Sequence, residues 1–132
     1  MSKRLPAIAP IPIDKTQVMA NFPKRPRDSH KGMFGTVAVI GGASGMVGAP
    51  LLAARAALKL GAGRVYVGLL DNTALAVDTD QPELMLRRPV EILSPGCVTA
   101  LAVGPGLGQG TDARDLLKQA LSTDLPLVLD AD

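Results

Sequence analysis

The chain has 132 residues, of which 47% are apolar and 20% charged; it carries a formal net charge of +2 and three aromatic residues, Phe22, Phe34 and Tyr66. This composition is typical of one soluble globular domain, and the scarcity of rings argues against stacking on single-stranded nucleic acid. No apolar run approaches the roughly 18 residues of a membrane span and no signal-peptide core is present, so we expect a cytoplasmic protein without membrane or nucleic-acid partners.

Charge is divided unevenly along the chain. Residues 1–31 hold seven basic and two acidic side chains, whereas the remainder holds seven basic and ten acidic ones. Residues 1–26 are therefore interpreted as a Pro-rich basic extension, in which residues 1–13 lie extended over the surface or over a neighbouring subunit. Residues 14–21 are expected to form a short helix that Asp14 caps. The basic extension is consistent with a solvated arm and with contact to an anionic ligand.

At residue 36 the composition changes from basic and Pro-rich to apolar, which marks the start of the globular part. The run "TVAVIGG" at 36–42 is apolar without alternation, which predicts a central parallel strand buried on both faces. After a glycine-rich turn, Val47, Leu51, Ala54 and Leu58 recur at helical spacing. That helix is expected to end at Gly61, because glycine readily adopts the left-handed conformation of a helix C-terminus.

Strands and helices alternate through the rest of the sequence. We expect strands at 64–70, 83–88, 97–104 and 126–132, an irregular crossover or short helix at 71–80, and a capped amphipathic helix at 111–122. Strands that alternate with helices predict an α/β fold with a parallel sheet and right-handed crossovers.

Two glycine clusters follow two of these strands. The first comprises Gly41, Gly42, Gly45 and Gly48, and the second Gly104, Gly106, Gly108 and Gly110. Ligands of open parallel sheets bind at the carboxyl ends of the strands, and glycines there expose backbone N–H groups and admit a ligand where a Cβ would collide. The alternative is that the glycines only permit tight turns; two clusters on one sheet edge favour a ligand.

Several familiar motifs are absent. Neither cluster is a P-loop or a G-x-G-x-x-G turn, and "GASGM" is not a hydrolase elbow. One histidine, His30, and one cysteine, Cys97, exclude a zinc site of ordinary composition, so no metal-ligating residue is assigned. A lone Cys97 also excludes an intrachain disulfide, which fits a reducing cytoplasm, and it is expected to be a buried strand residue. Asp130 and Asp132 could hold Mg²⁺ or position a nucleophile, or simply lie in water at the chain end.

Taken in order, the segments "RDSHKGMFGTVAVIGGASGMVGAPLLAARAALKLGAGRVYV", "QPELM", "AVGPGLG" and "LVLDAD" resemble the ADP- or ATP-dependent NAD(P)H-hydrate dehydratases of the ribokinase-like superfamily. The resemblance implies substrate contacts for Ala49 and Gly108, with Gly48 and Gly106 as neighbours in the same wall. The "DAD" segment is similar to one at the edge of the family's active site, where Asp130 is the residue to test.

The resemblance runs over 27–132 and implies a three-layer α/β/α fold that is truncated, since the family's later segments, which carry its catalytic base, are not found. No catalytic residue is therefore assigned. The implied activity is the repair of hydrated NADH or NADPH, in which ADP or ATP with Mg²⁺ phosphorylates the added hydroxyl to make it a leaving group. The main nucleotide site is expected outside this chain, and the family suggests a homo-oligomer, specifically a tetramer. Two alternatives are a kinase for a vitamin precursor or another small alcohol and a non-catalytic interaction module.

Overall fold

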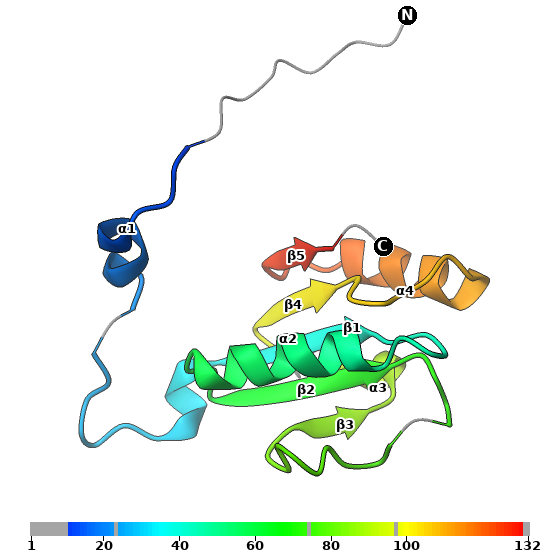
Figure 1. Ribbon diagram of the computed structural model, residues 1–132, viewed down its shortest axis with the longest axis horizontal. Coiled ribbons are helices and arrows are strands. Elements are labelled where there is room, and N and C mark those ends of the chain that lie inside the picture. The colour runs from blue at the N-terminus through cyan, green and yellow to red at the C-terminus, as the bar shows by residue number, and fades with distance from the viewer. Residues whose placement is uncertain (1–10, 23, 74, 97, 131–132) are drawn as a thin grey trace, which may run out of the picture.

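The computed structural model describes residues 11–22, 24–73, 75–96 and 98–130. Within them a five-stranded parallel sheet has the order β3-β2-β1-β4-β5 (Figure 1). The strands are β1 Thr36–Gly41, β2 Arg64–Leu69, β3 Met85–Arg87, β4 Ala100–Val103 and β5 Leu127–Leu129. The parallel sheet predicted from the alternation of strands and helices is confirmed.

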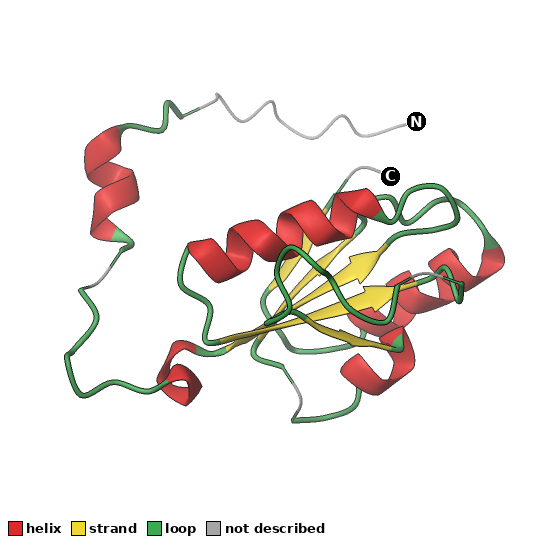
Figure 2. Ribbon diagram, turned by 60° about the horizontal axis from the view of Figure 1, so that its bottom comes forward, coloured by secondary structure: helices red, strands yellow, loops and turns green. Residues whose placement is uncertain are grey.

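Helices cover both faces of the sheet, which gives three layers (Figure 2). The helices are α1 Lys15–Ala20, α2 Gly48–Lys59, α3 Pro89–Ile92 and α4 Thr111–Leu121, with a 3₁₀ helix at Lys31–Phe34. Helix α2 packs through Leu51 and Ala54 on one face. Helices α3 and α4 pack on the other face, through Ile92 and Leu116 among others.

Strand β1 lies at the centre of the sheet, as its unbroken apolar run predicts. It pairs with β2 on one side and β4 on the other. Ile40 contributes to the core under α3 and α4, and Val39 to the core under α2; neither side chain is more than 1% exposed. Because both faces of β1 are covered, alternation of polar and apolar residues is absent from its sequence.

Several boundaries differ from the expectation. Strand β4 begins at Ala100 instead of 97, and β5 ends at Leu129 instead of 132. The crossover after β2 contains no helix at its described residues. Helix α4 has Gly110 as its N-cap and no side-chain cap, so the predicted capping is wrong. Cys97, Asp132 and residues 1–10 lie outside the described residues.

Helix α1 follows the expected pattern at its start. The Asp14 carboxylate accepts from the backbone N–H of Gln17 at 2.8 Å, while the Gln17 side chain accepts from the backbone N–H of Asp14, a complete capping box. No residue of this helix is buried. No helix among the described residues is long and apolar enough to cross a membrane.

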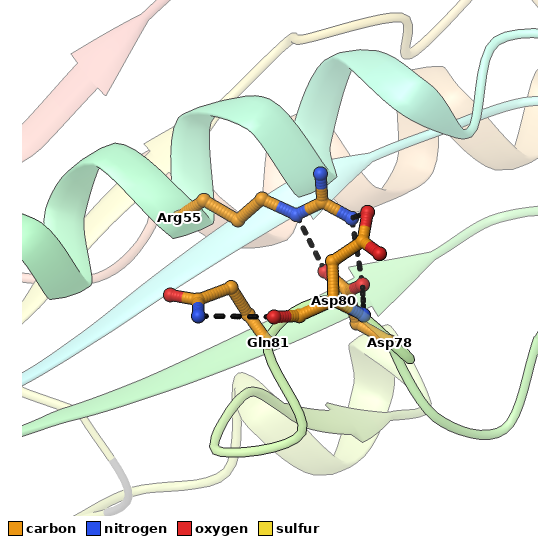
Figure 3. Close-up of polar contacts among 4 residues, drawn as sticks. All are labelled: Arg55, Asp78, Asp80 and Gln81. Carbon is orange, nitrogen blue, oxygen red and sulfur yellow. Dashed lines mark hydrogen bonds and ion pairs between the residues drawn. The ribbon is translucent and has the colours of Figure 1, made fainter.

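The crossover between β2 and β3 is attached to α2 by one buried carboxylate. Arg55 of α2 donates to both oxygens of Asp78, at 2.7 and 2.6 Å, and lies 3.1 Å from Asp80 (Figure 3). The Asp78 side chain is 2% exposed. Its Oδ1 also accepts from the backbone N–H of Asp80. A buried carboxylate is stable only when such donors surround it, so the pair holds the irregular crossover against the helix.

The Asp78 contact predicts a pH-dependent contribution to stability. The hydrogen bonds from Arg55 hold the pKa of Asp78 below its usual value, against the opposing effect of burial. A carboxylate whose pKa falls on folding stabilises the protein above the unfolded pKa of about 3.9, and this stabilisation is lost as the pH falls through the folded pKa. Asp78→Asn should therefore lower the melting temperature at pH 7, and the difference from the unmodified protein should shrink below pH 4.

Thermal unfolding at several pH values, with Asp80→Asn as the control, measures this effect. The Asp80 side chain is 73% exposed, so its substitution should have a much smaller effect because exposed ion pairs are weak. Equal effects of the two substitutions at pH 7 would contradict the assigned role of Asp78.

Candidate functional site

The two glycine clusters lie in loops that are hydrogen-bonded to each other at the carboxyl ends of β1 and β4. The backbone N–H of Gly42 donates to the carbonyl of Pro105 at 3.0 Å, and that of Ala43 to the carbonyl of Gly106 at 2.7 Å. The adjacency of β1 and β4 in the sheet makes these bonds possible. The predicted convergence of the two clusters is therefore present, through main-chain contacts.

Three of the predicted site residues lie on the two loops where they meet, and two of them, Ala49 and Gly106, are direct neighbours. A Cβ on Gly106 would lie 3.4 Å from the Cβ of Ala49, and one on Gly108 would lie 3.3 Å from the Cβ of Ala43. Gly106 and Gly108 adopt φ of +59° and +74°, a region that strongly favours glycine. Gly106 thus neighbours Ala49, and Gly108 neighbours Ala43 of the same loop; we call Ala49, Gly106 and Gly108 the glycine wall, and Gly48 precedes Ala49 at its border.

Loop packing accounts for part of the glycine content. A Cβ on Gly106 would lie 2.6 Å from the carbonyl oxygen of Met46, and one on Gly41 would overlap the carbonyl oxygen of Pro105. At these two positions the absence of a side chain is needed for the loops to approach each other. The tight-turn interpretation is thus correct for some members of each cluster.

Other glycines have no such neighbour. A Cβ on Gly48 or Gly45 would have nothing within 4 Å. Gly48 is the first residue of α2, a helix whose start has no side-chain cap. Uncapped N–H groups at the start of a helix attract anions. The space at Gly48 is thus open to a ligand, and protein packing does not explain the choice of glycine there.

The ends of β2 and β5 flank the glycine loops. The backbone N–H of Asp130 donates to the carbonyl of Val103 at 2.9 Å, and a Cβ on Gly104 would lie 2.8 Å from the Cβ of Asp130. On the other side, the backbone N–H of Asp71 donates to the carbonyl of Gly42 at 3.0 Å. Asp130 therefore lies at the predicted edge. The expected pairing with Asp132 falls outside the described residues.

Asp71 is a carboxylate at this edge that the sequence interpretation did not single out. Its Oδ1 accepts from the hydroxyl and the backbone N–H of Thr73, at 2.6 and 2.8 Å. These bonds hold the pKa of Asp71 below its usual value, with a smaller contribution from Ser44 of the first glycine loop. The signal in the sequence was a D-x-T turn directly after a strand, which is too common to indicate a site by itself.

Two cavities border the edge. The larger, about 830 Å³, is lined by residues that include Leu69, Asp71, Leu86, Arg87 and Glu91, and it lies at the ends of β2 and β3. The smaller, about 230 Å³, includes Gly108, Gln109 and Arg114. The larger cavity is the less relevant to the predicted site, because it contains none of the glycine-wall residues and approaches that wall only through Asp71.

Divalent cations prefer clusters of carboxylate oxygens. Among the described residues no group of three or more His, Cys, Asp or Glu side chains is placed to hold a metal ion. These residues alone therefore do not fit the Mg²⁺ that accompanies a nucleotide, and no reaction step is assigned to them through it.

Known proteins are similar to this chain in sequence and in architecture. Residues 37–132 match the NAD(P)H-hydrate dehydratase family. The ADP-dependent (S)-NAD(P)H-hydrate dehydratase of Neisseria meningitidis serogroup B is 47% identical over 114 residues, which cover 84% of this chain and 38% of that protein. The ATP-dependent enzyme of Drosophila melanogaster is 30% identical over 142 residues, which cover 96% and 47%.

Solved structures of related proteins have a similar fold. The ADP/ATP-dependent NAD(P)H-hydrate dehydratase of Bacillus subtilis, co-crystallised with ATP and Mg²⁺, superposes with a TM-score of 0.76 at 31% identity, covering 89% of this chain and 44% of that one. A ribokinase-like superfamily protein of Enterococcus faecalis gives a TM-score of 0.71 at 27% identity, covering 87% and 43%. The chain spans less than half the length of these relatives, and within that span it belongs to the NAD(P)H-hydrate dehydratase family.

Proposed function

We propose that the protein restores hydrated NADH or NADPH to the normal cofactor with ADP or ATP, and that this chain supplies the substrate side of the site. The observation that carries the proposal is the glycine wall. Two loops far apart in the sequence are joined by main-chain hydrogen bonds; Gly106 lies against Ala49 and Gly108 against Ala43, all within the stretch that matches the family.

The physical properties of the wall suit a dinucleotide. Its substrate would carry a diphosphate, and Gly48 at the uncapped start of α2 borders open space. Next to it the backbone N–H of Ala49 donates to the carbonyl of Met46 at 3.4 Å and Pro50 has no N–H, so the N–H of Gly48 is the one proposed to bind a phosphate oxygen, as N–H groups at helix N-termini do. Residues without bulky side chains let the rings of the ligand lie against the main chain. The role proposed for this chain is to bind and orient the substrate, and no residue of it is assigned a chemical step.

Nucleotide and Mg²⁺ belong to the proposed reaction through the relatives, which are named ADP-dependent in Neisseria and ATP-dependent in Drosophila. When bound, they supply the phosphoryl group that converts the added hydroxyl into a leaving group. Asp130, at the rim of the wall, is proposed as a residue that contacts substrate. We also propose that the protein acts in the cytoplasm and assembles as a homo-oligomer.

A reconstituted assay tests the activity. The protein as it is naturally produced is incubated with hydrated NADH and Mg²⁺, with ADP and ATP in separate reactions, and NADH and free phosphate are measured. Because the nucleotide phosphorylates the hydroxyl that then departs, the proposal predicts equal amounts of NADH and phosphate with at least one of the nucleotides.

The same assay separates the rival functions. A ribokinase-like fold also suits a kinase; a kinase would leave hydrated NADH unchanged and accumulate a phosphorylated alcohol when a vitamin precursor is supplied. A non-catalytic interaction module would give neither product. Either of these two results would contradict the dehydratase proposal.

A further inference from the structure

The strands of this sheet have the order that is found in open sheets that bind dinucleotides. From one edge the order is β3-β2-β1-β4-β5, so β2 and β3 lie on one side of β1, and β4 and β5 on the other (Figure 1). In such sheets the diphosphate lies at the start of the helix after β1, and an acidic side chain after β2 accepts from a ribose hydroxyl. The G-x-G-x-x-G turn of those proteins is absent here, so only the placement of strands and loops is shared.

Asp71 lies at the position of that acidic side chain. It follows Gly48, the first residue of α2, by about 20 residues, which is the separation that the dinucleotide-binding sheets show. The backbone N–H groups of Leu70 and Asp71 donate to the carbonyls of Gly41 and Gly42, at 2.9 and 3.0 Å. Asp71 therefore continues the pairing of β2 with β1 and is fixed beside the first glycine loop.

The Asp71 carboxylate is able to accept a further hydrogen bond. The bonds from Thr73, with a smaller contribution from Ser44, hold the pKa of Asp71 below its usual value, so the group is charged at neutral pH. A carboxylate offers about four acceptor positions. The hydroxyl and the backbone N–H of Thr73, together with Ser44, supply three donors, which leaves a position for a hydroxyl of a ligand.

The cavity of about 830 Å³ that Asp71 lines suits the adenosine half of a dinucleotide. Small-molecule sites typically measure roughly 300–1,000 Å³. The buried side chains in its lining, Val67 and Leu69, are apolar, and Arg87 and Arg88 line it on the side of β3 and α3. Guanidinium groups stack on planar aromatic rings. Adenine is planar, whereas the hydrated nicotinamide ring is puckered at the carbon that carries the added hydroxyl, so the adenine is the better fit.

We propose that the adenosine half of the dinucleotide binds in this cavity with a ribose hydroxyl donating to Asp71, and that Asp71 makes the protein select hydrated NADH over hydrated NADPH. The two substrates differ only in the 2′-phosphate on that ribose, which the Asp71 carboxylate repels. The diphosphate then lies at the N–H of Gly48, and the nicotinamide half lies along the glycine wall. The identity of the ligand rests on the proposed function.

Calorimetric titration with NADH and with NADPH tests the proposal without turnover, because both carry the same adenosine half as their hydrates. The protein as it is naturally produced should bind NADH at least about tenfold more tightly than NADPH, and Asp71→Asn should remove most of this difference. The asparagine keeps an oxygen that can accept from Thr73, so the turn after β2 is retained. Asp80→Asn is the matched control, because Asp80 lies in the same crossover, is 73% exposed and does not line the cavity; it should keep the difference. Equal affinities for the two cofactors, or tighter binding of NADPH with its 2′-phosphate on Arg88, would overturn the proposal.

Filling the cavity gives an independent measurement. Val90 lines the cavity and is 57% exposed, so Val90→Trp narrows the cavity without disturbing the core and should weaken NADH binding about tenfold. Leu121→Trp is the matched control, because Leu121 is also 57% exposed but lies on α4, outside the cavity; it should leave NADH binding unchanged. Unaltered NADH affinity in a folded Val90→Trp variant would show that the cavity does not hold the adenosine half.

Turnover assays separate a failure of this proposal from a failure of the proposed function. If hydrated NADH is not restored with ADP or ATP, while NADH and NADPH bind as described, the proposed function is wrong and Asp71 keeps its assigned role. If both hydrates are restored, and Asp71→Asn leaves the ratio of their kcat/KM values unchanged, the role of Asp71 is wrong and the function stands. A Val90→Trp variant with a raised KM for ADP or ATP, and an unchanged KM for the hydrates, would assign the cavity to the phosphoryl donor and also overturn the proposal.

Discussion

Replacing Gly106 by alanine is expected to destabilise the protein and to abolish most of the proposed dehydratase activity. Gly106 has a φ of +59°, where an alanine costs about 1–2 kcal/mol. Its new Cβ would lie 2.6 Å from the carbonyl oxygen of Met46 and 2.8 Å from the Met46 Cβ, and forcing such overlaps typically costs roughly 1–3 kcal/mol more. The two loops must separate to relieve the overlap, which displaces the glycine wall.

Gly45→Ala is the matched control for this substitution. Gly45 has a φ of +81°, yet a Cβ there would meet nothing within 4 Å. It should therefore carry the conformational cost, about 1–2 kcal/mol, without the overlap. Denaturant unfolding and turnover of hydrated NADH measure both variants. If Gly106→Ala were no more harmful than Gly45→Ala, the close loop contact would not be needed for the site.

Truncating Ile92 to alanine is the second large effect that we expect. Ile92 is 1% exposed and belongs to the core cluster that includes Ile40 and Leu101. Its Cδ1 lies 3.0 Å from the position that a Cβ on Gly68 would occupy, so α3 sits closely on β2. Loss of a buried isoleucine beyond its Cβ costs about 2–5 kcal/mol, and the free energy of unfolding should fall by that amount.

Val90→Ala, on the same helix, provides the comparison. Val90 is 57% exposed, so its truncation should change stability by no more than about 0.5 kcal/mol, as for other surface positions. Chemical unfolding of both variants gives the two differences directly. If the free energy of unfolding fell by less than about 1 kcal/mol for Ile92→Ala, the Ile92 side chain would not pack in the core as the structure indicates.

The strongly patterned elements were predictable from sequence. The run at 36–42 is apolar without alternation, and only a strand covered on both faces tolerates this arrangement. The spacing of Leu51, Ala54 and Leu58 similarly identified α2. These predictions succeeded because the order of apolar and polar residues in a central strand or a long helix follows which of its faces are buried.

Short elements contain too few residues for their hydrophobic periodicity to be recognised in the sequence. Helix α3 has four residues, fewer than the periodicity of a helix requires for recognition, and it was missed. The role of Asp78 was likewise hidden, because its partner Arg55 lies 23 residues away on α2 and nothing local marks a buried carboxylate. Such contacts depend on tertiary packing, which the local sequence does not encode in readable form.

The sequence predicted where the candidate site lies, but it only partly predicted why glycines occur there. Glycines after β1 and β4 indicated a ligand site at the carboxyl edge, and the structure brings these loops together. Gly41 and Gly106 serve the contact between the loops, however, whereas Gly48 borders open space. Main-chain hydrogen bonds between loops leave no side-chain pattern, so the sequence could not separate the two roles.

The most direct test of the central claim is to replace Gly48 by alanine and to measure both stability and KM for hydrated NADH. A Cβ there meets nothing within 4 Å, and Gly to Ala at the start of a helix should leave the free energy of unfolding unchanged or raise it by up to about 1 kcal/mol. Gly96→Ala, where a Cβ also meets nothing within 4 Å and which lies outside both glycine clusters, is the control and should leave KM unchanged. If substrate lies against the glycine wall, Gly48→Ala raises KM roughly tenfold, equivalent to about 1.4 kcal/mol of binding. A fully folded Gly48→Ala variant with the KM of the unmodified protein would contradict the account.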